Sequence, residues 1–343
     1  MAQATDFRDG LCRSALSIRA CQLIGAVCIR GGLTCPVMSH EEAQPFLEWI
    51  GRDPTAAVRL MSDADEVPHH TALLEFGDMT QFSRTGLGSC PRIPKVSTEV
   101  LNRQRDLDVL QRLGLMPGDT RRARWLYELL FERIDTPAGI CACDTPGWQG
   151  CPHAKSGVYE RVRERGWRRM VHARTREEME TCRQRSAERI AEGDRIFMRP
   201  HHVMCMACWY AGGEGQGPRP NDTIHEIFER IRREPTVPLT LIEGTCDVCY
   251  CCDGFDPETT RCVHGGGLIR DYKKDLDVFR KLGLAPGATM PAREFVRLLF
   301  ERIASTQGIC GYGDGIVRSE GWRICGDPQG SPGYAKSRET GML

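Results

Sequence analysis

The sequence predicts an α+β protein made of two tandem, pseudo-symmetric, helix-rich copies with irregular cysteine loops. Three observations lead to this prediction: a long internal repeat, helix-period patterns between short β-type runs, and dense clusters of cysteine between them. With 343 residues, 41% hydrophobic and 27% charged, the chain is long enough for two domains that each bury a core.

The internal repeat is unambiguous. Residues 106–141 recur as residues 275–310 at a constant offset, and 21 of these 36 positions are identical. The match extends outward, because residues 17–32 align with residues 197–212. The chain therefore divides into a first copy at 1–171, a charged linking helix at 172–196 and a second copy at 197–343.

Local patterns predict the elements, most clearly from the linker onward. Residues 172–193 are densely charged and lack proline, which predicts the linking helix. Asp222 can cap a helix at 223–233, whose apolar residues recur at spacings of three and four. A strand is expected at 237–242, and Pro238 would confine it to the edge of a sheet.

Two more helices are expected after the cysteine loop, at 268–282 and 291–303. Gly283 ends the first of them, and Pro291 suits the first turn of the second. The first copy has the same order of patterns. Each copy is therefore expected to be a small α+β unit.

Seven cysteines fall within 64 residues of the second copy, and four of them lie within residues 246–252. They are Cys205, Cys208, Cys246, Cys249, Cys251, Cys252 and Cys262. Thiolates so crowded indicate a metal, either zinc in a closed tetrahedron or a cubane iron–sulfur cluster with one thiolate per iron. The spacing alone does not choose between these metals.

Residues 197–285 resemble a family of uncharacterised bacterial and archaeal domains regarded as iron–sulfur binders, which open with R-P-H-H-x-x-C and carry a later D-x-C-x-x-C. Here the opening is Arg199-Pro-His-His-Val-Met-Cys205, and the later motif is Asp247-Val-Cys-Tyr-Cys-Cys252. The resemblance implies one 4Fe–4S cluster and no particular reaction. The ligands that it implies are Cys205, Cys249, Cys252 and Cys262.

Further residues of the same segment are candidates for additional ligands or for groups that surround the metal. They are Cys208, Cys246, Cys251, His201, His202 and Arg199. One histidine could replace a thiolate at an iron, or both could donate hydrogen bonds to cluster sulfur. Arg199 could instead pair with an acidic surface residue. A zinc site is complete with four ligands and would leave three thiols over.

The first copy cannot rebuild this site from the aligned positions. Gly25 stands against Cys205, and Pro68 and Thr71 stand against two other ligands. We therefore expect a degenerate first copy that keeps the fold and lacks this cluster. The cysteines that it retains against the second copy are Cys28 and Cys90.

Both copies also contain Gly-Ile-Cys followed by Gly-Trp-x-x-Cys. Their cysteines are Cys141 and Cys151 in the first copy and Cys310 and Cys325 in the second. Cys143 and His153 lie beside the first pair. Three interpretations remain open: buried thiols that pack as small hydrophobic groups, a redox dithiol, and a second metal site.

Charge and motifs exclude several classes of function. The 46 basic residues equal the 46 acidic residues, so no net field favours nucleic acid or an anionic membrane, and we expect neither partner. The apolar stretch at 20–29 is too short to span a bilayer. The cysteines cluster at the spacings of metal ligands, so we expect the protein to reside in a reducing cytoplasm. The sequence contains no P-loop, H-E-x-x-H or G-x-S-x-G signature.

Together these features predict a 4Fe–4S protein of anaerobic or redox metabolism. It would be an oxidoreductase or a subunit of a redox complex, with a redox protein or a small molecule as its partner. One alternative is a zinc-stabilised binding or scaffold protein without catalysis, and another is a non-redox, lyase-type enzyme with an open iron. The repeat predicts a pseudo-dimer within one chain, which can join a larger complex.

Overall fold

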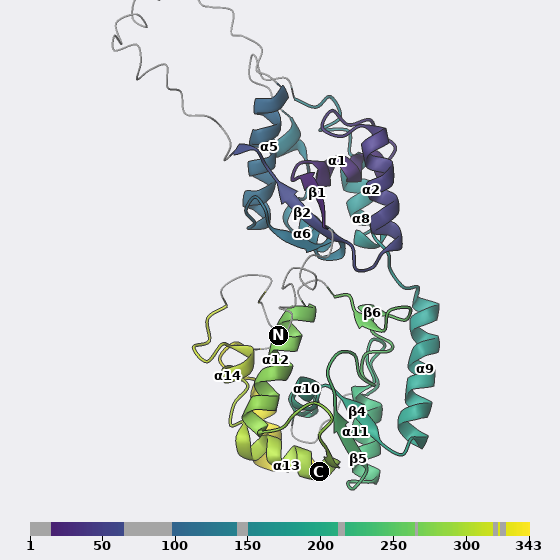
Figure 1. Ribbon diagram of the computed structural model, residues 1–343, viewed down its shortest axis with the longest axis vertical. Helices are drawn as coiled ribbons and strands as arrows, with labels where there is room; N and C mark the ends of the chain where they lie inside the picture. Colours follow the sequence, from purple (N-terminus) through teal and green to yellow (C-terminus); the bar gives the residue numbers. More distant parts are fainter. Residues whose placement is uncertain are drawn as a thin grey trace, which may run out of the picture. The chain divides into compact units, whose positions relative to one another are not determined.

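The computed structural model describes residues 15–64, 98–142, 150–211, 217–264, 267–317, 322 and 327–343. The chain divides into two compact units, Met1–His172 and Ala173–Leu343, and each has its own hydrophobic core. Both units combine helices with small sheets, so the predicted α+β class is confirmed (Figure 1).

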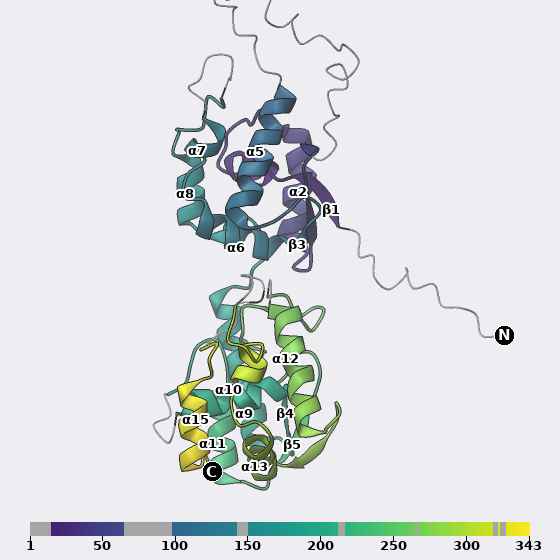
Figure 2. The same ribbon diagram turned by 90° about the vertical axis from the view of Figure 1, so that its left-hand side faces the viewer.

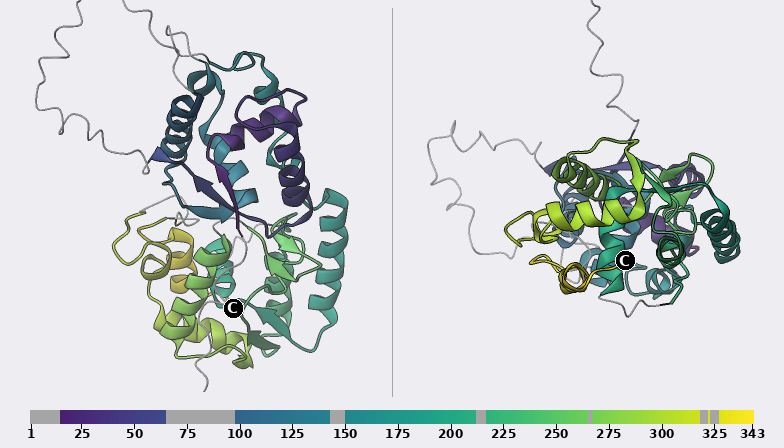
Figure 3. Two further views of the ribbon diagram at one scale, coloured as in Figure 1. Left: turned by 45° about the horizontal axis from the view of Figure 1, so that its top comes forward. Right: turned by 90° about the horizontal axis from the view of Figure 1, so that it is seen from below.

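The first unit packs its helices around one short sheet (Figure 3). Its strands have the order β1-β2-β3, with β1 parallel and β3 antiparallel to β2. The elements are β1 (Leu16–Arg19), α1 (Gln22–Arg30), α2 (His40–Arg52), β2 (Ala57–Met61), α5 (Thr98–Leu113), β3 (Thr120–Arg122), α6 (Ala123–Arg133), α7 (Ala138–Cys141), α8 (Val158–Glu164) and the 3-10 turn Trp167–Arg169.

The second unit repeats this plan and adds a leading helix and a small hairpin. Its main sheet has the order β4-β5-β8, again with one parallel and one antiparallel pair. The elements are α9 (Arg176–Glu192), β4 (Ile196–Met198), α10 (Pro200–Tyr210), α11 (Ile224–Arg233), β5 (Pro238–Leu241), β6 (Phe255–Asp256), β7 (Arg261–Cys262), α12 (Gly267–Leu282), β8 (Thr289–Pro291), α13 (Ala292–Arg302), α14 (Gln307–Cys310) and α15 (Pro332–Thr340).

The two units share more than their order of elements. In each, a buried aspartate of the long helix accepts a hydrogen bond from a backbone N–H where the helix after the first strand begins: Asp106 from Cys21, at 2.9 Å, and Asp275 from His201, at 3.2 Å. A carboxylate there complements the unpaired amides and the positive end of the helix dipole. The predicted two-fold packing of the copies stays a prediction.

The strand predicted at 237–242 is present as β5, but it is not an edge strand. It lies between β4 and β8 in its sheet. Pro238 is tolerated there because it is the first residue of the strand, where it faces Pro291 of β8. Pro238 therefore indicates where this strand begins and does not indicate a position at the edge of the sheet.

Helix α9 fits the predicted linking helix and also packs within the second unit. Thr175 and Glu178 form a capping box at its start. Most of the helix is exposed, but Ser186 and Ile190 are buried, and the helix lies alongside α11 (Figure 1). Among the described residues, no helix is long and apolar enough to cross a membrane.

Candidate metal centre

A cavity of about 640 Å³ lies in the second unit, and its walls are rich in thiols. The four predicted ligands all line it. The cysteines in its lining are Cys205, Cys208, Cys249, Cys252, Cys262 and Cys310. Thiols from two helices, the cysteine loop and the β6–β7 hairpin thus meet around one space, although up to 105 residues separate them in sequence.

Helix α10 supplies the first of these thiols. Pro200 suits its first turn, because proline lacks the N–H that has no partner there. Cys205 and Cys208 are three residues apart, so they lie on one face of the helix. Helix α15 covers α10, with the Ser337 hydroxyl donating to the Ala207 carbonyl at 2.6 Å (Figure 2).

A buried ion pair fixes the start of α10. Both the Nε and an Nη of Arg199 lie 2.7 Å from Asp275 Oδ2, and these side chains are 3% and 0% exposed. His201 Nδ1 lies 2.6 Å from the other carboxylate oxygen. Burial opposes the charge of Asp275, but His201 and Arg199 outweigh it and lower its pKa. The partner of Arg199 is therefore a buried residue of α12 and not a surface acid.

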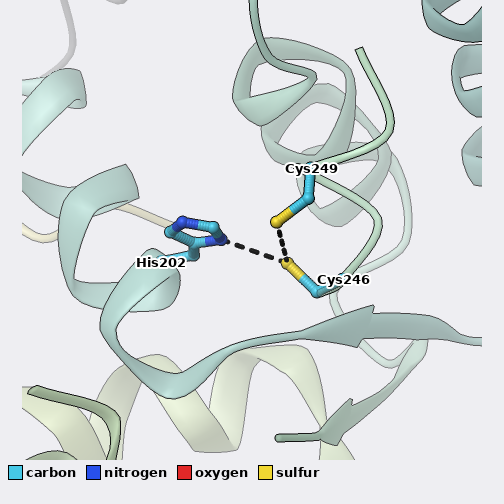
Figure 4. A group of neighbouring side chains, drawn as sticks. All are labelled: His202, Cys246 and Cys249. Atoms are coloured by element: carbon cyan, nitrogen blue, oxygen red, sulfur yellow. Dashed lines mark hydrogen bonds between the residues drawn. The ribbon is translucent and has the colours of Figure 1, made fainter. Parts of the chain in front are cut away.

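His202 faces the cysteine loop. Its Nδ1 lies 3.1 Å from Cys246 Sγ, which is 3.8 Å from Cys249 Sγ (Figure 4). The ligand atoms of these three residues lie within 4.8 Å of one another, so they could hold a metal ion. Burial, followed by the charge of Arg199, lowers the pKa of His202 to about 4. The imidazole is therefore neutral, which is the form that binds metals.

The second group that could hold a metal centres on Cys252. Its Sγ lies 3.1 Å from Nε2 of His264, which lies 3.4 Å from a carboxylate oxygen of Asp253. Gly254 donates its N–H to Cys252 Sγ at 3.3 Å. A side chain at Gly254 would displace His264, since its Cβ would lie 2.1 Å from a ring atom of that histidine. Sequence reasoning missed His264; the signal was its place two residues after Cys262.

Asp247, the acidic residue of the second motif, positions the loop. Its carboxylate accepts the Phe197 N–H at 2.9 Å, and its N–H donates to the Phe197 carbonyl at 3.1 Å. Its own carbonyl accepts the hydroxyls of Ser186, at 2.9 Å, and Thr223, at 2.8 Å. Arg189 of α9 pairs with the carboxylate. Asp247 thus ties the loop to β4 and α9, so it holds the thiols in place without touching the cavity.

The remaining loop thiols differ in their surroundings. Cys251 is fully buried and does not line the cavity; burial and the nearby Asp222 raise its pKa to about 12. Burial likewise raises the pKa of Cys252 to about 12. At Cys246 burial opposes ionisation, but hydrogen bonds from Cys249 and from the backbone, together with the charge of Arg199, outweigh it and lower the pKa. A bound metal would hold such buried thiols as thiolates.

The other predicted residues fall into three places. Cys310 lines the large cavity together with the predicted ligands. Cys141, Cys151 and His153 line a separate cavity of the first unit. Two predicted site residues and one retained cysteine lie outside the described residues: Cys143, Cys325 and Cys90.

No family model, curated protein or solved structure matches the chain. The resemblance of residues 197–285 to the R-P-H-H-x-x-C family therefore stays a prediction. The second unit does contain cysteine and histidine groups within metal-binding distance. Their geometry does not determine which metal they bind.

Proposed function

We propose that the second unit binds a 4Fe–4S cluster and that the protein acts in redox metabolism, as an oxidoreductase or as a subunit of a redox complex. The observation that carries this proposal is the convergence of six thiols on one cavity. A zinc tetrahedron and a 4Fe–4S cluster each use four ligands, so the number of thiols does not separate them, whereas the spread of these cysteines around a large cavity favours the cluster.

The residues around the cavity suit a cluster. Cys205, Cys249, Cys252 and Cys262 would hold one iron each. Within the described residues, these four sulfurs do not together form one group whose ligand atoms all lie within 4.8 Å of one another, whereas the sulfurs around one zinc ion lie roughly 3.8 Å apart. A bound cluster would supply one-electron transfer.

Buried Arg199 would influence that electron transfer. Burial opposes its charge, but Asp275 and then Cys249 outweigh burial and raise its pKa. The guanidinium is therefore a fixed positive charge beside the thiols. Such a charge stabilises the reduced, more negative cluster and raises its reduction potential.

The size of the cavity favours an enzyme over a simple electron carrier. Its volume of about 640 Å³ lies within the range of small-molecule pockets, so space would remain beside a cluster. The charged side chains in its lining include Asp271 and Lys274, which are joined by a 2.9 Å ion pair. They would bind the polar groups of a small substrate.

A second candidate function is a zinc-stabilised binding protein. The compact group of His202, Cys246 and Cys249, with a sulfur–sulfur distance of 3.8 Å, has the spacing of ligands around zinc. Zinc there would hold the cysteine loop on α10 and would supply no redox chemistry.

Metal analysis of the full chain, purified without oxygen, tests these candidates. The proposal expects iron and acid-labile sulfide in equal amounts, and loss of both from this site in a Cys249→Ser, Cys252→Ser variant. Cys182→Ser is the matched control, because Cys182 lies on α9, away from the cavity. Zinc without sulfide in the unmodified chain would refute the cluster and support the second candidate.

A further inference from the structure

The first unit contains a small thiol-lined cavity that the proposed function does not use. Its volume is about 20 Å³, enough for about one water molecule. The thiols in its lining are Cys21, Cys28, Cys35, Cys141 and Cys151, and its nitrogen-bearing side chains are those of Arg105 and His153. A space of this size excludes an iron–sulfur cubane, but it can hold a single metal ion.

Three segments bring four of these thiols together. Cys28 lies on α1, and its carbonyl accepts the Leu33 N–H at 3.0 Å in the turn that leads to Cys35. Cys141 ends α7, and its carbonyl accepts the Cys151 N–H at 2.7 Å. The backbone therefore holds the last two cysteines side by side, and it returns the chain from α1 toward the cavity at Cys35.

These four thiols are close enough to repel one another when they ionise. Burial and then the charges of the three other thiols raise the pKa of Cys28. Burial raises the pKa of Cys35 as well, and the charge of Cys151 adds to that effect. A divalent cation among such thiolates removes the repulsion and keeps them ionised.

Cys21 differs from the other lining thiols. Its N–H donates to the Asp106 carboxylate at 2.9 Å. Burial and then the charge of Asp106 raise the pKa of Cys21. A carboxylate beside this thiol disfavours the thiolate form that a metal ion needs, so Cys21 is not a ligand.

A buried cation accompanies the four thiols. Arg105 is only 3% exposed and lines the cavity. Burial raises the pKa of Cys141 to about 12, and the Arg105 charge opposes that effect. The aligned residue of the second unit, Lys274, is 1% exposed and lines the large cavity there. Neutral thiols that only fill an apolar core need no such charge, whereas metal-bound thiolates are anionic and are stabilised by it.

We propose that Cys28, Cys35, Cys141 and Cys151 bind one zinc ion within the first unit. Each thiol releases its proton to solvent and forms one Zn–S bond, so the four ligands complete a closed tetrahedron. Thiolates suit zinc, and none of the described residues that line the cavity carries the carboxylate that magnesium or calcium prefers. The ion joins α1, the Cys35 turn, α7 and the Cys151 segment, so its role is structural.

The cavity needs only a small contraction to bind zinc. Sulfurs that surround a water-sized space stand roughly 3.2 Å from its centre and roughly 5 Å from one another. This agrees with the described residues, where no three of these sulfurs lie within 4.8 Å of one another. Because a Zn–S bond is about 2.3 Å long, each sulfur moves inward by roughly 1 Å. Rotation of the side chains and small shifts of the turns that carry them supply such a movement.

The test loads the full-length chain with zinc after the second unit has been disabled. The variant Cys249→Ser, Cys252→Ser removes a ligand from both groups of that unit that could hold a metal. Incubated with zinc sulfate and freed of unbound metal, it is expected to keep about one zinc per chain. Adding Cys28→Ser and Cys151→Ser should remove that zinc, whereas adding Cys182→Ser on α9 should not. Equal zinc content with and without the Cys28 and Cys151 substitutions would overturn the proposal.

A second measurement does not depend on whether the variants fold. The four proposed ligands are only partly buried, so an alkylating reagent can reach them in the unmodified chain. In the zinc-loaded protein they should react about tenfold more slowly than after removal of the metal with a chelator, because alkylation needs a free thiolate. Cys182, which is also partly buried, should react at the same rate in both states. Equal rates for the four ligands, or a Cys141–Cys151 disulfide in the loaded protein, would contradict the proposal.

These outcomes are distinct from those that test the proposed function. In the otherwise unmodified chain, Cys28→Ser and Cys151→Ser should remove zinc and leave iron and sulfide unchanged. Loss of iron instead would show that these cysteines hold iron, and it would refute the zinc site. Zinc lost through these substitutions from a chain that contains no iron would support the zinc site and refute the cluster.

Discussion

Replacing Asp275 with asparagine should destabilise the second unit far more than the equivalent change destabilises the first. The substitution keeps the size of the side chain and an acceptor for the His201 N–H. It removes the charge that balances Arg199, which is 3% exposed and cannot reach water. Breaking a buried ion pair in this way costs about 3 kcal/mol, because one charge remains buried without its partner.

The first unit provides the matched control, Asp106→Asn. Asp106 pairs with Arg19 at 2.6 Å, but the Arg19 side chain is 28% exposed and also pairs with Asp63 at 3.0 Å. Arg19 therefore keeps a partner and contact with water after the change. The expected cost is about 1 kcal/mol, the upper end for a pair that water can reach.

Hydrogen exchange measured by mass spectrometry can follow each unit separately in the metal-free chain. A loss of about 3 kcal/mol corresponds to roughly a hundredfold faster exchange of the protected amides of α10 and α12. The control should accelerate exchange in α1 and α5 by less than about tenfold. Equal acceleration by the two substitutions would refute the argument that burial of Arg199 sets the cost.

Three further predictions follow from individual contacts. Gly254→Ala should weaken metal retention by the second unit, since its Cβ would displace His264; unchanged metal content would contradict this. Cys205→Ser should lower the iron content, whereas Cys251→Ser should not, because only the first lines the cavity; equal losses would count against this. Burial and then His202 lower the pKa of His201 to about 4 in the folded chain. Below about pH 6.5 the unfolded chain therefore binds a proton at His201 that the folded chain does not bind. Unfolding free energy of the metal-free second unit should therefore fall from pH 7 to pH 5 by about 2 kcal/mol for His201 and by a similar amount for His202, whose pKa is lowered to the same value, and a flat profile would contradict it.

Regular periodicity made part of the fold predictable. The apolar residues of α11 recur at spacings of three and four, and the prediction of 223–233 agrees with Ile224–Arg233. Helix α10 was not predicted, since apolar residues and thiols occur on all its sides and leave no polar face. Strand β8 has three residues, too few for a pattern of its own.

The four predicted cysteine ligands all line one cavity. They could be predicted because the motifs that suggested them are local in sequence. Partners that depend on the tertiary fold were missed. Asp275 lies 76 residues from Arg199, yet the repeat preserves both Arg-Asp pairs and could have revealed it. Cys35 has no counterpart in the aligned sequence, so only the structure could place its sulfur beside Gly25.

Electron paramagnetic resonance of the anaerobically purified full chain, before and after reduction with dithionite, tests most directly whether the protein is a redox protein. Reduction by one electron makes a 4Fe–4S cluster paramagnetic, so a signal should appear on reduction and disappear on reoxidation. Its intensity should fall in the Cys249→Ser, Cys252→Ser variant. Zinc has a filled d shell and gives no signal in either state. A chain that stays silent after reduction and contains stoichiometric zinc would contradict a redox function.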